Sequence, residues 1–581
     1  MGGFVLLRHD ADARRAPAVL QSFEKHGGFG GARRFETAHW RLVVYAKLGG
    51  QPAAVHVKDA ENFVAGVGTF LYRGMIGNEA LARFFEDVEG DCVAWREAYG
   101  SYCIILQRRG QLTLIPDRLG VYKVYRNDDG TVISSSFLAA LESIEHPRAD
   151  VQSVYEYVFQ GATYDERTVI EQVRLMERNA SFALDRDIRV EKRADDLWEG
   201  PRWSAFEPFR ALTLDALREE FAGFARAFGN NIDTALSGGY DSRLILALLR
   251  EQGLAPRVHV YGAAESEDVR IARTIATGEG FFLDHTDKSA RPPVEPAGFP
   301  AIVARNFSLF DGYPADGIFD AGSDAETRQR RTGNAGLALN GGGGEIFRNF
   351  FYLTDRSFRL RDIMWAFFSQ FDPAVCTAAF VEESYLARLA TAVARLLNIE
   401  PGEDVLALRL SRQQVEYLYP CFRCVYWMGR NNSVNNRFGY YATPFIEPAL
   451  VQLGLQIPMR FKAHGKFEAA LIRDADPALA HYPSAYGQPL DEAPTLKRRF
   501  KSGLTVLRPV RARRLSYRLQ NRLHRPGRRS EIYGPAYLST VLDPSFPEMK
   551  RYFHPEKIAS EAELNRICTL EYLFEKYGVA S

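Results

Sequence analysis

The chain has 581 residues, of which 46% are hydrophobic, and 73 Lys and Arg balance 72 Asp and Glu. Such a length is expected to form two domains with packed cores. A formal net charge of +1 argues against nucleic acid as a partner of the whole chain. No apolar run approaches the roughly eighteen residues needed to cross a bilayer. Six cysteines do not make a disulfide framework in so long a chain, and an acidic residue as early as Asp10 argues against a signal peptide, so a cytoplasmic protein is expected.

Short alternating or apolar runs follow one another through residues 1–195, and such runs are typical of β-strands. We expect strands at 4–7, 40–46, 63–73, 102–107, 112–116, 121–125 and 181–184. Because few long helices separate these runs, the sequence predicts an N-terminal domain of stacked, mainly antiparallel sheets.

The rhythm changes to alternating strands and helices in a second predicted domain, residues 210–581. An apolar strand at 232–236 leads into a glycine turn, and a helix runs from Asp241 towards Gly253. A second strand at 257–262 precedes a helix with Ser266 as N-cap. Repeated βα units predict a doubly wound parallel sheet with many helices, whose ligands bind at the carboxyl ends of the strands. The linker is expected near 198–201.

The turn after the first of these strands has the properties of a phosphate-binding loop. A strand, a tight loop and a helix N-terminus direct unpaired N–H groups and a positive dipole end towards one point. Gly238 and Gly239 let the backbone approach an anion closely, while the Ser237 and Ser242 hydroxyls can donate hydrogen bonds to it. The Asp241 carboxylate can hold Mg²⁺. This pattern predicts a nucleotide site without a P-loop lysine.

The segment SGGYDS at 237–242 resembles the signature of the ATP-pyrophosphatase enzymes, and the order of motifs around it resembles the asparagine synthetase family over nearly the whole chain. Further similar segments lie at 116–125, 135–141, 339–347, 437–447 and 465–473. The resemblance implies a glutamine amidotransferase-like N-terminal domain of the Ntn type, followed by an ATP-pyrophosphatase domain.

The resemblance also implies a set of site residues and the cofactors ATP and Mg²⁺. Lys466 is expected near the α-phosphate, Glu345 as a catalytic residue, and Asp241 with Glu345 at the metal. The residues expected to bind the nucleotide are Leu236, Ser237, Gly238, Gly239, Asp241, Ser242, Val260, Tyr261, Gly262, Gly342 and Gly343. Gly344 stands where the family has an aspartate, and the family's second lysine is missing from 482–488, where Tyr486 could supply only a hydrogen bond.

The N-terminal domain departs from the family as well. Gly2 stands where the family has its cysteine nucleophile, and the glutamine-binding segment is not recognisable around 68–73, so glutaminase activity is expected to be lost. Relatives without this cysteine include the β-lactam synthetases, the carbapenam synthetases and the lasso peptide cyclases. They adenylate a carboxylate and let an amine of the same molecule attack it.

These features predict an ATP-dependent, AMP-forming amide-bond ligase that acts on a small-molecule or peptide carboxylate. The alternatives are an intramolecular cyclase of the lasso or β-lactam type, a non-catalytic scaffold that binds ATP, and an ATP-pyrophosphatase that modifies RNA. The polar run at 430–437 is expected to approach the acceptor substrate, since its asparagines and arginines can bind carboxylates and amides.

A basic segment at 493–530 contains no acidic residue and thirteen Lys or Arg. Arginines at helical spacing beside Leu515, Leu519 and Leu523 predict a basic amphipathic helix over 508–525. Such a helix could dock a peptide, a membrane surface or a protein partner, and it could equally pack as a solvated face on its own domain. A homodimer is a further expectation.

Overall fold

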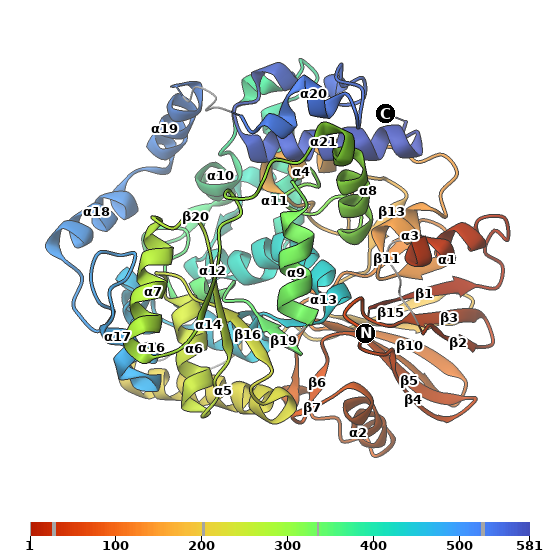
Figure 1. Cartoon of the computed structure of the whole chain (residues 1–581), viewed down its shortest axis with the longest axis horizontal. Coiled ribbons are helices and arrows are strands. Elements are labelled where there is room, and N and C mark those ends of the chain that lie inside the picture. The colour runs from red at the N-terminus through yellow and green to blue at the C-terminus, as the bar shows by residue number, and fades with distance from the viewer. Residues whose placement is uncertain (1, 26–30, 200–203, 334–335, 524–528, 581) are drawn as a thin grey trace.

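The computed structural model describes residues 2–25, 31–199, 204–333, 336–523 and 529–580, and Figure 1 shows their arrangement. Antiparallel sheets formed by the N-terminal part lie at one side of the molecule, and a parallel sheet with many helices lies beside them. The structure thus confirms the predicted α/β fold class.

Two six-stranded antiparallel sheets form the N-terminal part of the chain, residues 3–192, which is called the first half below. The first has the order β13-β11-β12-β1-β3-β2 and the second β15-β14-β10-β9-β5-β4. The first sheet comprises β1 (Gly3–Arg8), β2 (Arg33–Glu36), β3 (Trp40–Tyr45), β11 (Tyr125–Asn127), β12 (Val132–Ser134) and β13 (Val173–Leu175). The second comprises β4 (Ala54–Asp59), β5 (Asn62–Gly68), β9 (Tyr102–Arg108), β10 (Gln111–Pro116), β14 (Ala180–Leu184) and β15 (Ile188–Lys192).

The apolar side chains of β1 are buried on both faces of the strand. Phe4 and Leu6 enter the core that also holds residues of β5, β9 and β10. Val5 and Leu7 point to the other face, where they pack with α1 (Ala16–Lys25) and α3 (Phe137–Leu141). Successive side chains of a strand alternate between faces, so a continuous apolar run indicates a strand that is buried on both.

Two expected strands are wrong in their bounds. The run 63–73 is divided into β5 and the short β6 (Leu71–Tyr72), because Gly68 adopts a φ of +82°. The run 121–125 is a loop up to Tyr125, because the Asp117 carboxylate accepts hydrogen bonds from the backbone N–H groups of Val121 (2.9 Å) and Tyr122 (2.8 Å). A carboxylate that binds consecutive N–H groups competes with strand pairing.

The second half contains a five-stranded parallel sheet with the order β18-β17-β16-β19-β22. Its strands are β16 (Ile232–Ala235), β17 (Arg257–Tyr261), β18 (Leu283–Thr286), β19 (Leu337–Leu339) and β22 (Tyr440–Ala442). The chain runs from β16 outward to β18 and then returns to add β19 on the other side of β16. The strand order therefore reverses between β16 and β19, and such a switch point is where open α/β sheets bind ligands.

The helices around this sheet extend from α5 (Phe206–Phe228) to α21 (Glu561–Tyr577). Those nearest the switch point are α6 (Asp241–Glu251), α7 (Glu267–Glu279), α9 (Ser323–Gly333), α13 (Gly429–Phe438) and α16 (Lys466–Ala475). The helix expected from Asp241 is α6, and Gly253 follows it with a φ of +73°, as predicted. Among the described residues, no helix combines the length and the apolar character needed to cross a membrane.

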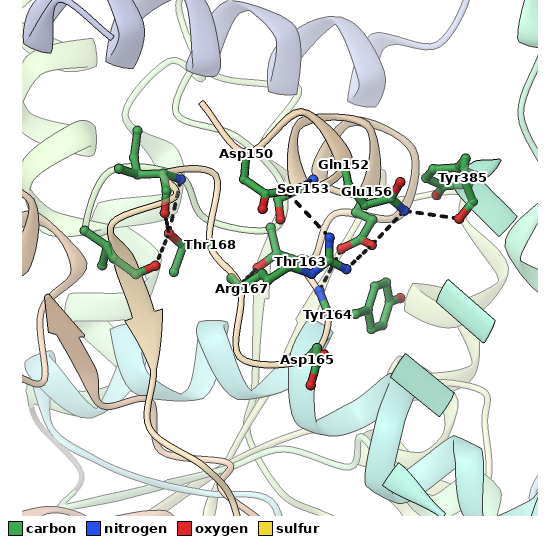
Figure 2. A network of polar contacts seen from close by, with 12 residues as sticks. Asp150, Gln152, Ser153, Glu156, Thr163, Tyr164, Asp165, Arg167, Thr168 and Tyr385 are labelled. Carbon is green, nitrogen blue, oxygen red and sulfur yellow. Dashed lines mark hydrogen bonds and ion pairs between the residues drawn. The ribbon is translucent and has the colours of Figure 1, made fainter. Parts of the chain in front are cut away.

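Polar side chains buried between the two halves tie them together. The Lys47 ammonium, 1% exposed, donates to the backbone oxygens of Asn436 (2.5 Å) and Gly439 (2.7 Å). Glu156 on α4 (Val151–Gln160) is fully buried and accepts from Arg167 at 2.7 Å, as Figure 2 shows. In the same network Gln152 donates to the backbone oxygen of Tyr385 on α11 (Glu382–Leu396). The predicted linker at 198–201 lies partly outside the described residues.

The basic segment forms an arm of two helices at the margin of the molecule (Figure 1). They are α18 (Leu496–Leu507) and α19 (Val510–Leu523), separated at Pro509, so the helix predicted over 508–525 corresponds to α19. Arg514 and Arg518 turn towards the protein and pair with Glu382. The predicted partner of this arm stays a prediction.

Candidate functional site

The predicted phosphate loop lies at the carboxyl end of β16, at the switch point. Leu236 is buried, and the hydroxyls of Ser237 and Ser242 lie 3.0 Å apart. The backbone N–H groups of Ser237 and Gly239 donate to the Ser242 and Ser237 hydroxyls at 3.0 and 3.2 Å. Because the serines bond within the loop, they set its shape as well as offering hydroxyls to a ligand.

Two other parts of the chain hold this loop and the start of α6 in place. The N–H of Gly238 donates to the Asp268 carboxylate at the start of α7 (2.8 Å), and its carbonyl accepts from the N–H of Ala485 (3.0 Å). The fully buried Arg243 donates to three backbone oxygens at 479–483, of which the shortest contact is 2.7 Å, to Pro483. The loop is therefore clamped between α7 and the segment that follows α16.

The expected adenosine side lies at the end of the next strand, β17. Val260 is buried in the core, whereas the Tyr261 hydroxyl has no hydrogen-bond partner in the described part of the chain. Gly262 adopts a φ of +138° and donates its N–H to the Thr286 carbonyl at 3.2 Å. Because β17 pairs directly with β16, its carboxyl end lies next to the loop, and Tyr261 also lines a cavity at this edge of the sheet. The predicted contact with adenosine stays a prediction.

The glycine run that follows β19 faces the first loop closely. A Cβ on Gly341 would lie 3.0 Å from Cβ of Asp241, and one on Gly344 would lie 1.9 Å from the Asp241 carboxylate oxygen. The N–H of Gly342 donates to the Asn340 side chain at 2.6 Å, and Gly343 takes a φ of +94°. A side chain at residue 344 would therefore displace the Asp241 carboxylate from its present position.

Arg348 occupies the centre of the acidic side of the site. Its guanidinium binds both Asp241 oxygens, at 2.8 and 2.7 Å, and its Nε lies 3.0 Å from Glu468 on α16. The same guanidinium lies 3.5 Å from Glu345 and donates to the Tyr486 hydroxyl at 3.0 Å. One cation thus collects three carboxylates from three elements.

The electrostatics of this cluster follow from its burial. Burial raises the pKa of the fully buried Glu468 well above its ordinary value, and the nearby Asp241 raises it further. Burial also disfavours the charged form of Arg348, yet the carboxylates of Glu468, Asp241 and Glu345 hold its pKa well above the ordinary value. Arg348 therefore stays charged among these side chains.

A cavity of about 600 Å³ opens beside the glycine run. Its lining combines aromatic rings with polar groups from α9 and α13. Among its lining residues are Tyr261, Arg328, Arg331, Asn340, Gly342, Gly343, Glu345, Phe350, Phe367, Tyr419, Arg423, Trp427, Asn431, Asn432 and Asn435. Predicted nucleotide residues from two different loops therefore share one cavity with residues that were not predicted.

The polar run at 430–437 lies on α13 and divides its faces between two tasks. Asn431, Asn432 and Asn435 face the cavity, as expected for a region that approaches a substrate. The other face joins the first half of the protein: the Asn436 Oδ1 accepts from the Thr69 hydroxyl at 2.7 Å, and the Ser433 hydroxyl accepts from the N–H of Lys123 at 2.8 Å. The polar residues on this second face of α13 therefore hold the two parts of the protein together.

Lys466 does not join the cluster. It is exposed at the first position of α16, and its ammonium lies 4.9 Å over the ring of Phe206. The neighbouring Gly465 does touch the loop, since a Cβ there would lie 2.7 Å from the Tyr240 ring. The predicted role of Lys466 near the α-phosphate stays a prediction, and the same helix instead brings Glu468 to the site.

The sequence reasoning missed most of the charged groups that meet here. Arg348, Glu468 and Arg498 escaped it because they come from positions far apart in the chain. Arg498 on α18 donates to the Tyr240 hydroxyl at 3.0 Å and lies 4.5 Å over the ring of Tyr486. Signals existed for Glu468, which lies within the recognised segment 465–473, and for Arg348, which directly follows the segment 339–347.

The residues expected to hold Mg²⁺ fit a resident ion poorly. Within the described parts of the chain, no group of three or more His, Cys, Asp or Glu is arranged to hold a metal. Both expected ligands are engaged, Asp241 by Arg348 and Glu345 by Arg348 and the Tyr419 hydroxyl. Carboxylates that already bind a guanidinium have fewer oxygen lone pairs for an ion.

A larger cavity of about 810 Å³ lies between the first half and the end of α11. Lys123 lines it, and burial lowers the pKa of this lysine to about 7. None of the predicted site residues lines this cavity.

The N-terminal strand carries no nucleophile at residue 2. Gly2 is buried and donates its N–H to the Tyr45 carbonyl at 2.9 Å. The nearby Cys103 is fully buried in the sheet core, and burial raises the pKa of its thiol well above the ordinary value. A buried, protonated thiol is a poor nucleophile.

Comparisons with known proteins leave the family open. No protein-family model matches the chain, and no curated protein does. A structure of the allosteric regulatory enzyme of purine biosynthesis is 13% identical with a TM-score of 0.23, and the match covers 49% of this chain and 65% of that one. A glutamine phosphoribosylpyrophosphate amidotransferase from B. subtilis, complexed with ADP and GMP, is 12% identical with a TM-score of 0.23, covering 51% and 82%. The chain thus spans slightly less than two thirds of the first of these, and overlaps this weak carry no argument about its activity.

Proposed function

We propose that the protein is an ATP-dependent, AMP-forming amide-bond ligase of the asparagine synthetase type without a working glutaminase. The observation that carries the proposal is the meeting of two loops at the switch point. The Ser237–Ser242 loop and the 341–344 glycine run face each other across Asp241, beside a cavity of about 600 Å³. Strand, loop and helix N-terminus together form an anion site at that point.

The proposed reaction has two steps. A substrate carboxylate oxygen attacks the α-phosphorus of ATP, which forms an acyl-adenylate and releases pyrophosphate. The nitrogen of an amine then attacks the acyl carbon, loses a proton, and displaces AMP. Because pyrophosphate leaves in the first step, stabilising its charge is the main task of the loop and of the start of α6.

The cavity favours a carboxylate with an apolar or aromatic portion. Phe350, Phe367 and Trp427 provide aromatic surface on its wall. Arg423 lies 4.3 Å over the Trp427 ring, and its buried Nη1 has no hydrogen-bond partner among the described residues. A guanidinium with a free donor beside aromatic rings can anchor a carboxylate through charge-assisted hydrogen bonds. A small aromatic acid or a peptide carboxylate meets both conditions.

Gly2 supports an amine source other than glutamine. A glutaminase of the expected type needs a thiol at this position, and glycine supplies none. The attacking amine then belongs to the substrate or to a second substrate. An intramolecular amine would make the protein a cyclase, which is the finer form of the same proposal.

The test is ATP–pyrophosphate exchange with a panel of aromatic acids and peptides, for the native protein and for Asp241→Asn. We expect exchange with at least one carboxylate and its loss in the variant. The matched control is Asp215→Asn on α5, whose carboxylate is exposed and pairs only with a neighbouring arginine at 3.3 Å; it should exchange normally. Binding of ATP without pyrophosphate exchange for every carboxylate would instead support a non-catalytic scaffold.

A further inference from the structure

We infer that the guanidinium of Arg348 takes the place of a protein-bound divalent cation in the phosphate site, so that this chain binds the pyrophosphate end of its nucleotide through a fixed cation. The inference rests on the proposed nucleotide site. Asp241 and Glu345, the residues expected to bind the metal, contact the Arg348 guanidinium instead.

The position of Arg348 is defined from several sides. It is 16% exposed at its side chain and contacts Asp241 on α6, Glu468 on α16 and Tyr486 in the segment after α16. Its Cζ also lies 5.5 Å from the centre of the Tyr240 ring. A guanidinium whose Nη2 contacts both oxygens of one carboxylate, and which also lies over an aromatic ring, has little freedom to leave.

The glycine run leaves no room for the alternative arrangement. An acidic side chain at residue 344 would collide with the Asp241 carboxylate, since even its Cβ would lie 1.9 Å from that oxygen. Gly344 brings no carboxylate to the site, whereas Arg348 brings a positive charge to it. Arg498, which contacts Tyr240 and Tyr486, adds a second cation to the same side.

A fixed guanidinium can do much of what a metal does for a leaving pyrophosphate. Tyr486 uses only one of the two N–H groups of Nη1, so the second can donate to a phosphate oxygen, and the charge of the guanidinium does not titrate near neutral pH. It cannot generate a metal-bound nucleophile, but the proposed attack by a carboxylate does not need one.

The experiment measures binding of a non-hydrolysable ATP analogue by calorimetry, with Mg²⁺ and with EDTA. The native protein should bind within about threefold under both conditions. Arg348→Ala should bind at least about tenfold more weakly in EDTA, the effect of losing one or two charge-assisted hydrogen bonds. Mg²⁺ should restore much of that loss, because the freed carboxylates of Asp241 and Glu345 can then bind the ion. Mn²⁺ binding without nucleotide, followed by electron paramagnetic resonance, should appear in Arg348→Ala and not in the native protein.

Two further variants separate this role from a merely structural one. Arg348→Lys keeps the charge and should remain independent of Mg²⁺, whereas Arg356→Ala removes an exposed arginine over the Phe358 ring and should match the native protein. Native binding that needs Mg²⁺, or an Arg348→Ala variant that binds normally in EDTA, would overturn the inference alone. Absence of nucleotide binding in both conditions would overturn the proposed function and this inference with it.

A second inference rests on the arm formed by α18 and α19. The geometry points to docking of its outer face on an anionic lipid surface. The exposed apolar side chains follow helical spacing on each helix. They are Leu496, Phe500, Leu504 and Leu507 on α18, and Leu515 and Leu519 on α19, each between 55% and 81% exposed.

The charges of the arm are divided between its two faces. Arg513, Arg514 and Arg518 turn inward and bind the body of the protein. Lys497, Arg499, Lys501, Arg508 and Arg511 remain exposed among the leucines, and the segment has no acidic residue. Exposed apolar side chains in a segment whose charged residues are all cations are typical of helices that lie in a membrane interface.

Co-sedimentation with vesicles tests this second inference. The native protein should bind vesicles of phosphatidylcholine mixed with phosphatidylglycerol, less strongly as salt rises, and bind phosphatidylcholine alone poorly. Phe500→Ser with Leu504→Ser should weaken binding by about tenfold or more, at about 0.8 kcal/mol per buried methylene. Leu212→Ser, at an exposed leucine of α5, is the control. No vesicle binding, or capture of a soluble acidic peptide without vesicle binding, would overturn it.

Discussion

Replacing Gly238 by alanine tests whether the phosphate loop is as tightly clamped as the structure indicates. The new Cβ would lie 2.8 Å from both the Ala485 Cβ and the Ile271 Cδ1, well inside ordinary contact. The Ile271 methyl can rotate away, but Ala485 is held by its hydrogen bond to the Gly238 carbonyl. Overpacking of this kind costs about 1–3 kcal/mol, and the rigid neighbour favours the upper half of that range.

The cost divides between folding and binding. If the loop moves to relieve the clash, the folded protein loses less than the full ~1–3 kcal/mol of stability. The displaced loop then binds the nucleotide more weakly, by about tenfold for each 1.4 kcal/mol. Gly239→Ala is the matched control, because its Cβ would meet only the Ser237 Oγ at 3.4 Å. Calorimetric binding of an ATP analogue and thermal unfolding should be measured for both variants. A Gly238→Ala protein with native affinity and stability, or a Gly239→Ala protein that is equally impaired, would refute the reasoning.

Two further predictions concern buried charges. Arg167→Met leaves the fully buried Glu156 without its ion pair and should lower the free energy of unfolding by about 3–5 kcal/mol. Arg148→Met, which removes the exposed Arg148–Glu171 pair, is the control and should lower it by under about 1 kcal/mol. Differential scanning calorimetry measures both. Burial raises the pKa of Glu571 to about 7, so its neutral form is favoured in the folded protein. The stability this contributes is present below the ordinary pKa of a glutamate and is lost as pH rises through about 7. Glu571→Gln should therefore show a smaller fall in unfolding free energy over that pH range, and an unchanged pH profile in chemical denaturation would contradict the assignment.

Local patterns predicted the elements of the site well. The strand at 232–236, the helix from Asp241 and the strand at 257–262 depend on short apolar runs and glycine turns, and the structure places each where it was expected. The run 121–125 failed for a local reason that is visible only in three dimensions, since the Asp117 carboxylate binds the N–H groups that would otherwise pair in a sheet.

The sequence by itself determined the α/β fold class and the position of the glycine turn between β16 and α6, because periodicity and turn chemistry act over a few residues. Tertiary structure alone decided which charges meet there. Arg348, Glu468 and Arg498 are up to 150 residues apart in the chain and come together because the second loop and α16 pack against α6. The same packing left Lys466 outside the cluster, and it replaced an expected site for an ion with a guanidinium that is already in place.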